Sequence, residues 1–477
     1  MNAPDWFRRN MPLLRSADVL QQKPVVMLKN TAASDAGVVA ASSAPVTAKP
    51  APLAAPARST GERLGATLRQ KEEALSPRVL RRTLHELELV ADEKVSKFEG
   101  GRRAKGVATW YAKATPEQRR DAWLLMSEQF APDAKKVKAA REQYDAAQGT
   151  PEEGQAEIRL RKAFQSPRTR LLQRFSVFPE GLRFLLDMRA EWLPQLKTEK
   201  RLLALDAELE SLFANWFDVA FLELRRISWD SPASLIEKLI QYEAVHAIKG
   251  WADVKNRLDS DRRCYGFFHP RLPNEPLIFV EVALTDSISP CITPLLDESA
   301  ALADLKNATT AIFYSINNTQ VGLRGVTFGD SLIKRVVETL KAEFPKLKTF
   351  STLSPIPGLR SWLGKNSPEL VKPLQEADLS ALDEKSPLRQ TLMRQAAHYL
   401  GREMTDGKPL DSVARFHLGN GARIERLNWA GDPSANGMRQ SYGLMVNYVY
   451  DLKKLDKHRG MLALGQVAVS GDISSLF

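Results

Sequence analysis

A serine followed closely by two prolines is the first candidate for chemistry in this sequence. Residues 350–363 read FSTLSPIPGLRSWL, so Pro355 and Pro357 follow Ser354 after an apolar, β-like run. Because proline fixes φ and lacks a backbone donor, the strand is predicted to end at Ser354. A serine in this position is most often a turn residue. The motif Gly-x-Ser-x-Gly does not surround it, so a serine hydrolase has little support.

His417 is the histidine best suited to give or take a proton near neutral pH. The stretch VARFHLGNGARIERLNW is predicted to form a hairpin, with Asn420 and Gly421 in its turn and His417 on its first strand. The other histidines make weaker cases: His85, His398 and His458 are expected at surface or packing positions, and His246 and His269 are less easily assigned. No two histidines have the spacing of a metal pair on a helix, and no carboxylate cluster matches one, so a metal site is not expected.

A glycine-rich loop offers a possible anion site. Residues 317–331 read NNTQVGLRGVTFGDS and join a predicted strand to a predicted helix, with Gly322, Arg324, Gly325 and Gly329 among them. Free N–H groups at the start of a helix suit a phosphate or pyrophosphate. The spacing matches neither a Walker loop nor a dinucleotide fingerprint. From spacing alone, a flexible connection is slightly favoured over a phosphate site.

The elements that would position these residues belong to a mixed α and β part that begins near residue 211. Strands are predicted at 275–285 and 309–316, and residues 327–344 form a helix with a clear apolar stripe before the strand that ends at Ser354. Ser354 and the glycine loop would then share one edge of the sheet. Ligands usually bind at that edge in open α/β folds.

The preceding part of the chain is predicted to be helical. Residues 61–210 show helical periodicity without a fixed repeat, and helices are expected to start at Thr115 and Thr150, each of which precedes a proline. Residues 1–60 are rich in Ala, Pro, Ser and Thr and are expected to be disordered. Asp5 and Asp18 fit an organelle presequence poorly, which favours a bacterial cytoplasmic protein.

The overall composition is that of a globular protein with several cores. Of the 477 residues, 43% are hydrophobic and 26% are charged, and the two cysteines are too few for a disulfide framework. No apolar run is long enough for a membrane span. The net charge of +11 favours an anionic partner, which could be a nucleic acid, a lipid surface or a phosphate-bearing small molecule.

Several long motifs in collinear order resemble the malonyl-CoA decarboxylase family. They are RRCYGFFHP, EPLIFVEVALT, AIFYSIN, LRGVTFGDSLIKRVV, FSTLSPIPGL, FHLGNGARIERLNW and GLMVNYVY, and they cover most of residues 211–450. The resemblance implies an α+β protein, with an all-α helical oligomerisation domain at 61–210 and a catalytic domain of the GNAT acyltransferase type at 211–477. It also implies release of carbon dioxide from malonyl-CoA without a metal or organic cofactor, in a homo-oligomer that could be a tetramer.

The resemblance also carries over particular residues. Ser354 and His417 match the catalytic serine and histidine of the family, and Ser315 and Tyr450 match supporting positions around the acyl group. The coenzyme-binding loop falls on Arg324, Gly325, Val326, Thr327, Phe328, Gly329 and Asp330. Animal members carry a glutamate where this chain has Thr327, so a role for that acid does not transfer.

Two other functions are weighed against this one. An acyl-CoA-dependent N-acyltransferase would use the same fold and the same pyrophosphate loop, but it would need a groove for an amine acceptor. A nucleic-acid-binding scaffold is suggested only by the charge, since the sequence has no helix-turn-helix, RNA-recognition or zinc-finger signature. The resemblance therefore favours the decarboxylase, with no nucleic acid or membrane as a partner.

Overall fold

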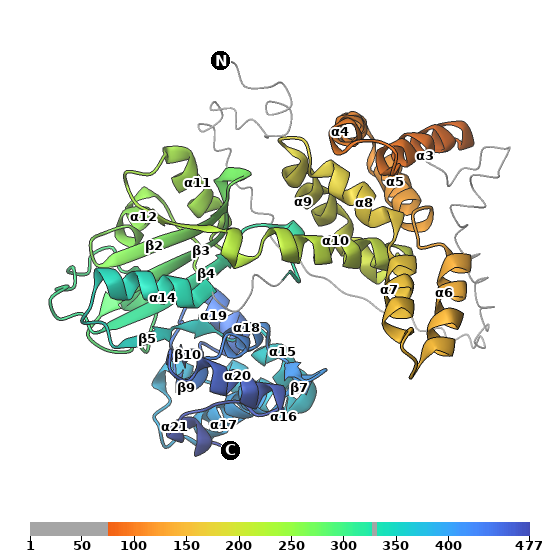
Figure 1. The fold of residues 1–477 in the computed structure, drawn as a ribbon. Helices are drawn as coiled ribbons and strands as arrows, with labels where there is room; N and C mark the ends of the chain where they lie inside the picture. The colour runs from red at the N-terminus through yellow and green to blue at the C-terminus, as the bar shows by residue number, and fades with distance from the viewer. Residues whose placement is uncertain (1–74, 327–331) are drawn as a thin grey trace, which may run out of the picture. The chain divides into compact units, whose positions relative to one another are not determined.

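A computed structural model describes residues 75–326 and 332–477 (Figure 1). Among the described residues, the elements before 223 are all helices. The elements are α3 (Pro77–Ala91), α4 (Lys97–Lys113), α5 (Pro116–Glu128), α6 (Ala134–Ala147), α7 (Glu153–Phe164), α8 (Pro167–Phe175), α9 (Gly181–Trp192), η1 (Leu193–Lys197), η2 (Lys200–Leu202), α10 (Leu203–Trp216) and η3 (Val219–Phe221). The predicted segment 1–60 lies outside the described residues.

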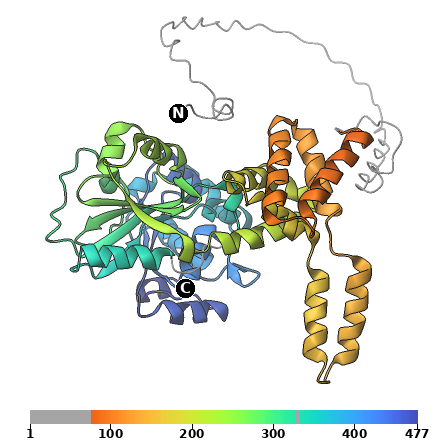
Figure 2. The same ribbon diagram turned by 45° about the horizontal axis from the view of Figure 1, so that its top comes forward.

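Local capping chemistry explains one of the two predicted helix starts. Thr115 caps α5 in a reciprocal capping box with Gln118, as predicted. The start predicted at Thr150 is wrong, because α7 begins at Glu153 and the Thr150 hydroxyl instead accepts the N–H of Glu152. Thr150 lies in the turn between α6 and α7. The two helices lie side by side as a hairpin (Figure 2).

Eight strands of the second part form one mixed sheet. They are β1 (Glu223–Ile227), β2 (Arg262–His269), β3 (Leu272–Thr285), β4 (Thr310–Asn318), β5 (Thr349–Thr352), β6 (Ser354–Pro355), β9 (Arg423–Asn428) and β10 (Met445–Val449). Their order is β1-β2-β3-β4-β5-β10-β6, with β9 also paired to β10, and only β4 and β5 run parallel. The predicted fold class, a helical domain followed by a mixed α/β domain, is confirmed.

The remaining elements surround this sheet. They are α11 (Ala233–Tyr242), α12 (Trp251–Arg257), α13 (Thr293–Leu296), η4 (Val321–Leu323), α14 (Leu332–Glu343), α15 (Leu359–Asn366), α16 (Pro368–Glu376), η5 (Leu379–Ala381), α17 (Pro387–Gly401), β7 (Met404–Thr405), β8 (Lys408–Pro409), α18 (Ser412–Gly419), α19 (Ala435–Ser441), α20 (Leu455–Ala463) and α21 (Gly471–Ser474). The apolar stripe of α14 packs on one sheet face, whereas α11 and α12 cover the other. The predicted strand–helix–strand unit β4–α14–β5 is therefore present.

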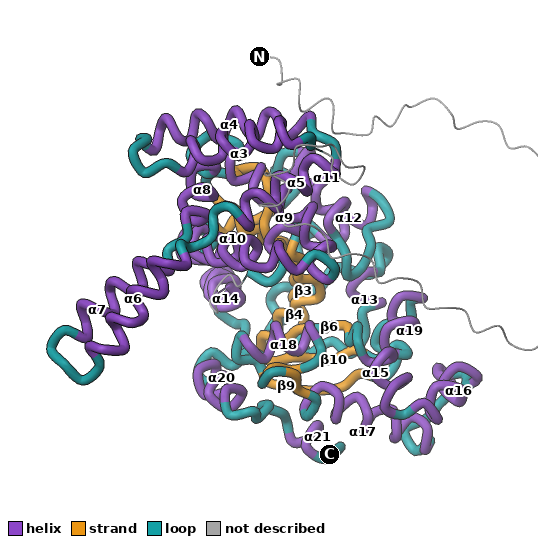
Figure 3. Tube along the Cα trace, turned by 90° about the vertical axis from the view of Figure 1, so that its right-hand side faces the viewer, coloured by secondary structure: helices purple, strands orange, loops and turns teal. Residues whose placement is uncertain are grey.

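The predicted hairpin around His417 is wrong. His417 lies in helix α18, whose N-terminus is capped by Asp411 through the N–H groups of Val413 and Ala414. Figure 3 shows α18 as a helix. Asn-Gly marks hairpin turns and helix ends alike, because both need a positive φ. Here Gly421 has a φ of +84° and donates to the Leu418 carbonyl, so it ends the helix.

The strand near Ser354 also differs from the prediction. β5 ends at Thr352, and Ser354 and Pro355 form β6, which pairs with β10. β6 lies at the end of the sheet order, so the missing N–H of Pro355 faces no further strand. Ser354 is thus held by a strand pair and not only by the prolines that follow it.

Candidate active site

Ser354 and His417 meet although 63 residues separate them along the chain. The Ser354 Oγ lies 3.2 Å from the Nε2 of His417, and both side chains are buried. β6 supplies the serine and α18 supplies the histidine. A helix, not the expected hairpin, therefore carries the imidazole to the serine.

Further hydrogen bonds extend this contact in both directions, from His417 to Tyr450 and from Ser354 to Thr352, and all four groups are neutral. The Nδ1 of His417 lies 2.7 Å from the Tyr450 hydroxyl, and Ser354 donates to the Thr352 Oγ1 at 2.9 Å. With its proton directed to Thr352, Ser354 accepts from Nε2–H, and Nδ1 then accepts from Tyr450. The Tyr448 ring stacks on the imidazole with centroids 4.6 Å apart. We call Tyr450, His417, Ser354 and Thr352 the hydrogen-bonded row.

Burial sets the charge state of this row. Removal from water lowers the pKa of His417 from its ordinary value to about 3, and no nearby charge opposes this effect. Burial likewise raises the pKa of Tyr450. Both side chains are therefore uncharged at neutral pH, and the row can transfer protons without carrying a fixed charge.

A cavity of about 770 Å³ joins His417 to the glycine loop. Gly325 and Val326 come from the loop, and Ile316 and Asn318 come from the end of β4. Two cationic side chains also line it, namely Lys408 and Arg415. The cavity thus combines an apolar wall, a buried imidazole and positive charge, which suits a long anionic ligand.

The described half of the loop is held from the helical part of the chain. Arg189 of α9 donates to the carbonyls of Gly322 and Arg324, both at 2.8 Å. Gly325 has a φ of +86°, a conformation that favours glycine. The expected contacts on Thr327, Phe328, Gly329 and Asp330 lie outside the described residues.

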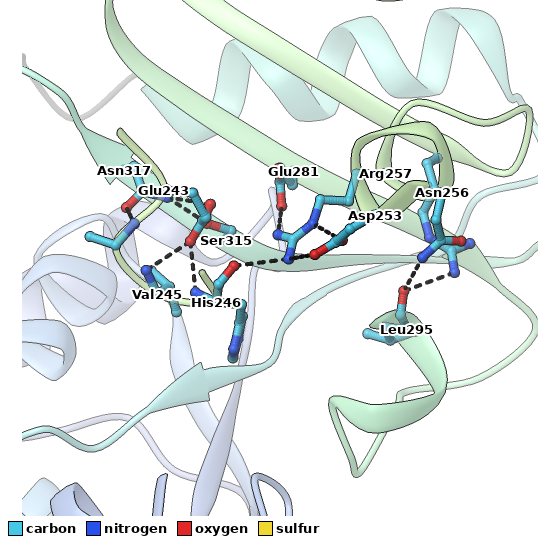
Figure 4. A network of polar contacts seen from close by, with 12 residues as sticks. Glu243, Val245, His246, Asp253, Asn256, Arg257, Glu281, Leu295, Ser315 and Asn317 are labelled. Atoms are coloured by element: carbon cyan, nitrogen blue, oxygen red, sulfur yellow. Dashed lines mark hydrogen bonds and ion pairs between the residues drawn. The ribbon is translucent and has the colours of Figure 1, made fainter. Parts of the chain in front are cut away.

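Ser315 takes part in a different set of contacts. It donates to Glu243 at 2.7 Å, and Asn317 donates to the same carboxylate oxygen at 2.8 Å (Figure 4). No hydrogen bond links Ser315 to the row within residues 75–326 and 332–477. The sequence interpretation missed Glu243, Asn317 and Thr352. Only Thr352 had a local signal, because residues two apart on a strand face the same side.

No group of three or more His, Cys, Asp or Glu side chains among the described residues could hold a metal ion. Cys264 and Cys291 are both free thiols. None of the described helices has the length and apolar character of a membrane span.

Comparison with known proteins finds two matching family models. The Malonyl-CoA decarboxylase C-terminal domain matches residues 220–477, and the Malonyl-CoA decarboxylase N-terminal domain matches residues 130–217. The first of these covers more than half of the chain. Both parts of the fold are therefore matched by one family, in the order expected for it.

Individual proteins agree with the family models. The mitochondrial malonyl-CoA decarboxylase of Mus musculus is 39% identical over 339 residues, which are 63% of this chain and 68% of that protein, and the one of Anser anser anser is 38% identical with 63% and 67% coverage. A solved malonyl-CoA decarboxylase from Rhodopseudomonas palustris has a TM-score of 0.75 at 38% identity and covers 83% of this chain and 99% of its own. The one from Cupriavidus metallidurans has a TM-score of 0.67 at 40% identity, with 84% and 100% coverage.

Proposed function

The chain belongs to the malonyl-CoA decarboxylase family, and from this premise we infer that it converts malonyl-CoA to acetyl-CoA and carbon dioxide. The observation that carries the inference is the hydrogen-bonded row, because its His417 lines a cavity whose wall also includes the glycine loop. A coenzyme A ester in that cavity would bring its acyl end to His417. Its phosphates would meet the loop, Lys408 and Arg415.

The reaction needs a proton donor more than a nucleophile. When the bond between C2 and the carboxylate carbon breaks, its electron pair moves into the thioester and forms an enolate, which must then take a proton at C2. Hydrogen-bond donors aimed at the thioester oxygen stabilise this enolate. Because the thioester carbonyl itself accepts the electron pair, we propose that no metal or organic cofactor is required.

We assign the protonation of C2 to His417. A thioester enolate is a much stronger base than an imidazolate, so a neutral imidazole is acidic enough to protonate it. The proton leaves from Nε2, directly or through Ser354, and Tyr450 supplies a proton to Nδ1. Solvent then restores the proton of Tyr450, and the imidazole returns to its Nε2–H tautomer before the next turnover, so each reaction consumes one proton. Ser354 either hydrogen-bonds the malonyl carboxylate or passes this proton.

Coenzyme binding is proposed for the loop as a whole. Arg324, Gly325 and Val326 precede the part outside the described residues, and Thr327, Phe328, Gly329 and Asp330 complete the proposed set. Support comes from the cavity wall, which includes Gly325 and Val326 beside two cationic side chains. Ser315 is proposed to support the acyl group only indirectly, since its hydroxyl is engaged with Glu243.

We further propose a homo-oligomer, possibly a tetramer, formed through the helical part. Large apolar side chains on α4 and α7 support this, because Phe98, Ile158 and Phe164 are 80%, 42% and 48% exposed. A bacterial cytoplasm is the proposed compartment, supported by the bacterial origin of the solved relatives. The curated relatives named mitochondrial make an organelle the alternative.

The first test supplies malonyl-CoA alone, with no amine acceptor. We expect acetyl-CoA and carbon dioxide in equal amounts, and in deuterated water one deuterium at C2. Ser354→Ala and His417→Asn are expected to lower kcat by about 100-fold or more, the usual loss for a general acid–base group. The exposed His398, which pairs with Glu403, gives the matched control His398→Asn with unchanged activity. Absence of product with the wild type, or unchanged turnover in both site variants, would refute the assignment.

A further inference from the structure

His246 is a second buried histidine, and it has a free ring nitrogen. The residue is 7% exposed, and its Nε2 is buried without a hydrogen-bond partner. Burial also lowers the pKa of its imidazole, so the ring is neutral near pH 7. Buried polar groups in folded proteins nearly always have partners, so an unpaired one is a reason to look for a ligand.

The backbone of His246 is fixed on both sides. Its N–H donates to Glu243 at 2.8 Å, and its carbonyl accepts from Arg257 at 2.8 Å. Arg257 is itself held by Asp253 at 2.7 Å and by Glu281 at 2.9 Å. Figure 4 shows the imidazole pointing away from these carboxylates. The backbone of the turn at 243–246 is therefore fixed, while the Nε2 of His246 remains unused.

This turn contacts the end of β4, in the part of the strand that no longer pairs with β5. Pairing between these strands stops at Phe313 and Thr352, and the same register would place Ser315 level with Ser354. Glu243 accepts from Ser315 and Asn317, and the N–H of Ala244 donates to the side chain of Asn317 at 3.1 Å. The turn is thus attached to the end of β4, beyond the last pair of β4 with β5.

The charges of Glu243 and Asp432 oppose the effect of burial on the pKa of His246. The N–H of Asp432 donates to the carbonyl of Gly443, which precedes β10. β10 pairs with β6, the strand of Ser354. Through Glu243, His246 is accordingly tied to the end of β4, next to the strands that include β6 in the sheet order.

We propose that His246 binds the carboxylate of malonyl-CoA by donating a hydrogen bond from Nε2, and that Glu243 and Arg257 position it. The proposal rests on the proposed function. It adds to that function the residue that recognises the malonyl carboxylate, which leaves as carbon dioxide. A neutral donor orients the carboxylate without the strong ground-state stabilisation that a cation would provide. Since that carboxylate leaves as neutral carbon dioxide, strong ionic binding of it would slow the reaction.

The test compares two ligands that differ in this carboxylate. Ser354→Ala is used as the background to stop turnover, and malonyl-CoA and acetyl-CoA are titrated calorimetrically into it. Adding His246→Ala is expected to weaken malonyl-CoA binding by about tenfold, as loss of one hydrogen bond to a charged group implies, and to change acetyl-CoA binding less than about twofold. Adding His246→Gln, which keeps a donor near the same place, is expected to restore most of the affinity. Equal effects on both ligands, or no effect on either, would overturn the proposal.

Two further measurements separate the possible failures. His269 is a half-buried histidine that lies against the Phe217 ring, so His269→Ala serves as the matched control and should leave both affinities unchanged. Wild-type turnover of malonyl-CoA is measured in parallel. If the wild type releases no carbon dioxide, the proposed function fails. If it does so and His246→Ala still binds both ligands normally, only the carboxylate assignment fails.

Discussion

At the scale of single residues, the hydrogen-bonded row differs from a hydrolytic triad in the group behind the histidine. A triad places a carboxylate on Nδ1 and so stabilises the imidazolium that forms when serine attacks. Here a buried, neutral Tyr450 takes that position, and burial alone lowers the pKa of His417 to about 3. A row of this kind supplies protons to a carbanion better than it activates a nucleophile, which agrees with decarboxylation.

The burial of His417 predicts a pH dependence of stability. Its pKa is about 3 in the folded chain and 6.5 ordinarily, so below pH 6.5 the unfolded chain binds a proton that the folded chain does not. The stability that depends on this neutral histidine is full above pH 6.5 and is lost as the pH falls toward 3. In His417→Asn the free energy of unfolding should therefore fall less than in the wild type between about pH 6.5 and about pH 4, by about 3 kcal/mol.

Urea titrations of both proteins at several pH values measure this difference. The remaining histidines are common to the two chains, so their titration cancels in the comparison. Parallel curves of unfolding free energy against pH for the two proteins would contradict the assignment of a neutral, buried His417.

At the scale of elements, the N-cap of α18 decides where His417 lies. Asp411 accepts the N–H groups of Val413 and Ala414 at 2.9 and 3.0 Å, and it also accepts from the Tyr399 hydroxyl at 3.3 Å. The buried carboxylate thus both starts the helix and joins it to α17. Movement of this cap would shift the imidazole relative to Ser354, on which proton transfer depends.

Removing the cap should therefore affect both stability and catalysis. Asp411→Ala is expected to cost about 1–2 kcal/mol of unfolding free energy and to lower kcat, because α18 loses its cap and its attachment to Tyr399. Asp133 offers the matched control, since it caps the exposed helix α6 through the N–H groups of Lys135 and Lys136. Asp133→Ala should destabilise the protein without changing kcat. Equal effects of both substitutions on kcat would show that the cap has no special role at the site.

At the scale of the whole molecule, the helical part holds the glycine loop, whose Gly325 and Val326 line the cavity. All described residues fall within one compact unit. Arg189 is 1% exposed and reaches from α9 to the carbonyls of Gly322 and Arg324, while Asp206 of α10 pairs with it at 2.8 Å. Gly322 also needs its lack of a side chain, because a Cβ there would lie 2.2 Å from the Leu186 carbonyl oxygen.

Loss of Arg189 should consequently weaken both the fold and coenzyme binding. Arg189→Leu leaves the buried Asp206 without its cationic partner, so we expect a loss of about 3–5 kcal/mol in unfolding free energy and a raised KM for malonyl-CoA. Arg161 pairs with Glu157 on the exposed surface of α7, and Arg161→Ala should change stability by less than about 1 kcal/mol. A normal KM in a folded Arg189→Leu protein would show that the loop keeps its shape without this contact.

The sequence by itself determined the elements whose signals are local. α14, β3 and β4 follow from apolar periodicity and β-rich composition, and the start of α5 follows from a threonine and a proline in adjacent positions. The sequence also identified Ser354, His417 and the glycine loop as candidates, through their chemical types and the family resemblance. Helix starts, apolar stripes and strand composition depend on residues within about one turn of each other. A short stretch of sequence is therefore sufficient to predict these elements.

Only the tertiary structure decided how these candidates work together. Asn-Gly fits a hairpin or a helix end, and α18 forms because Asp411 caps it and because Ala414, His417 and Leu418 bury one face. The partners of His417 and Ser315 lie 63, 33 and 72 residues away, so no local pattern could assign them. The low pKa of His417 likewise comes from removal of water by surrounding elements. Contacts between residues this far apart in the sequence depend on how the whole chain packs. Burial of a side chain likewise requires that the core has formed.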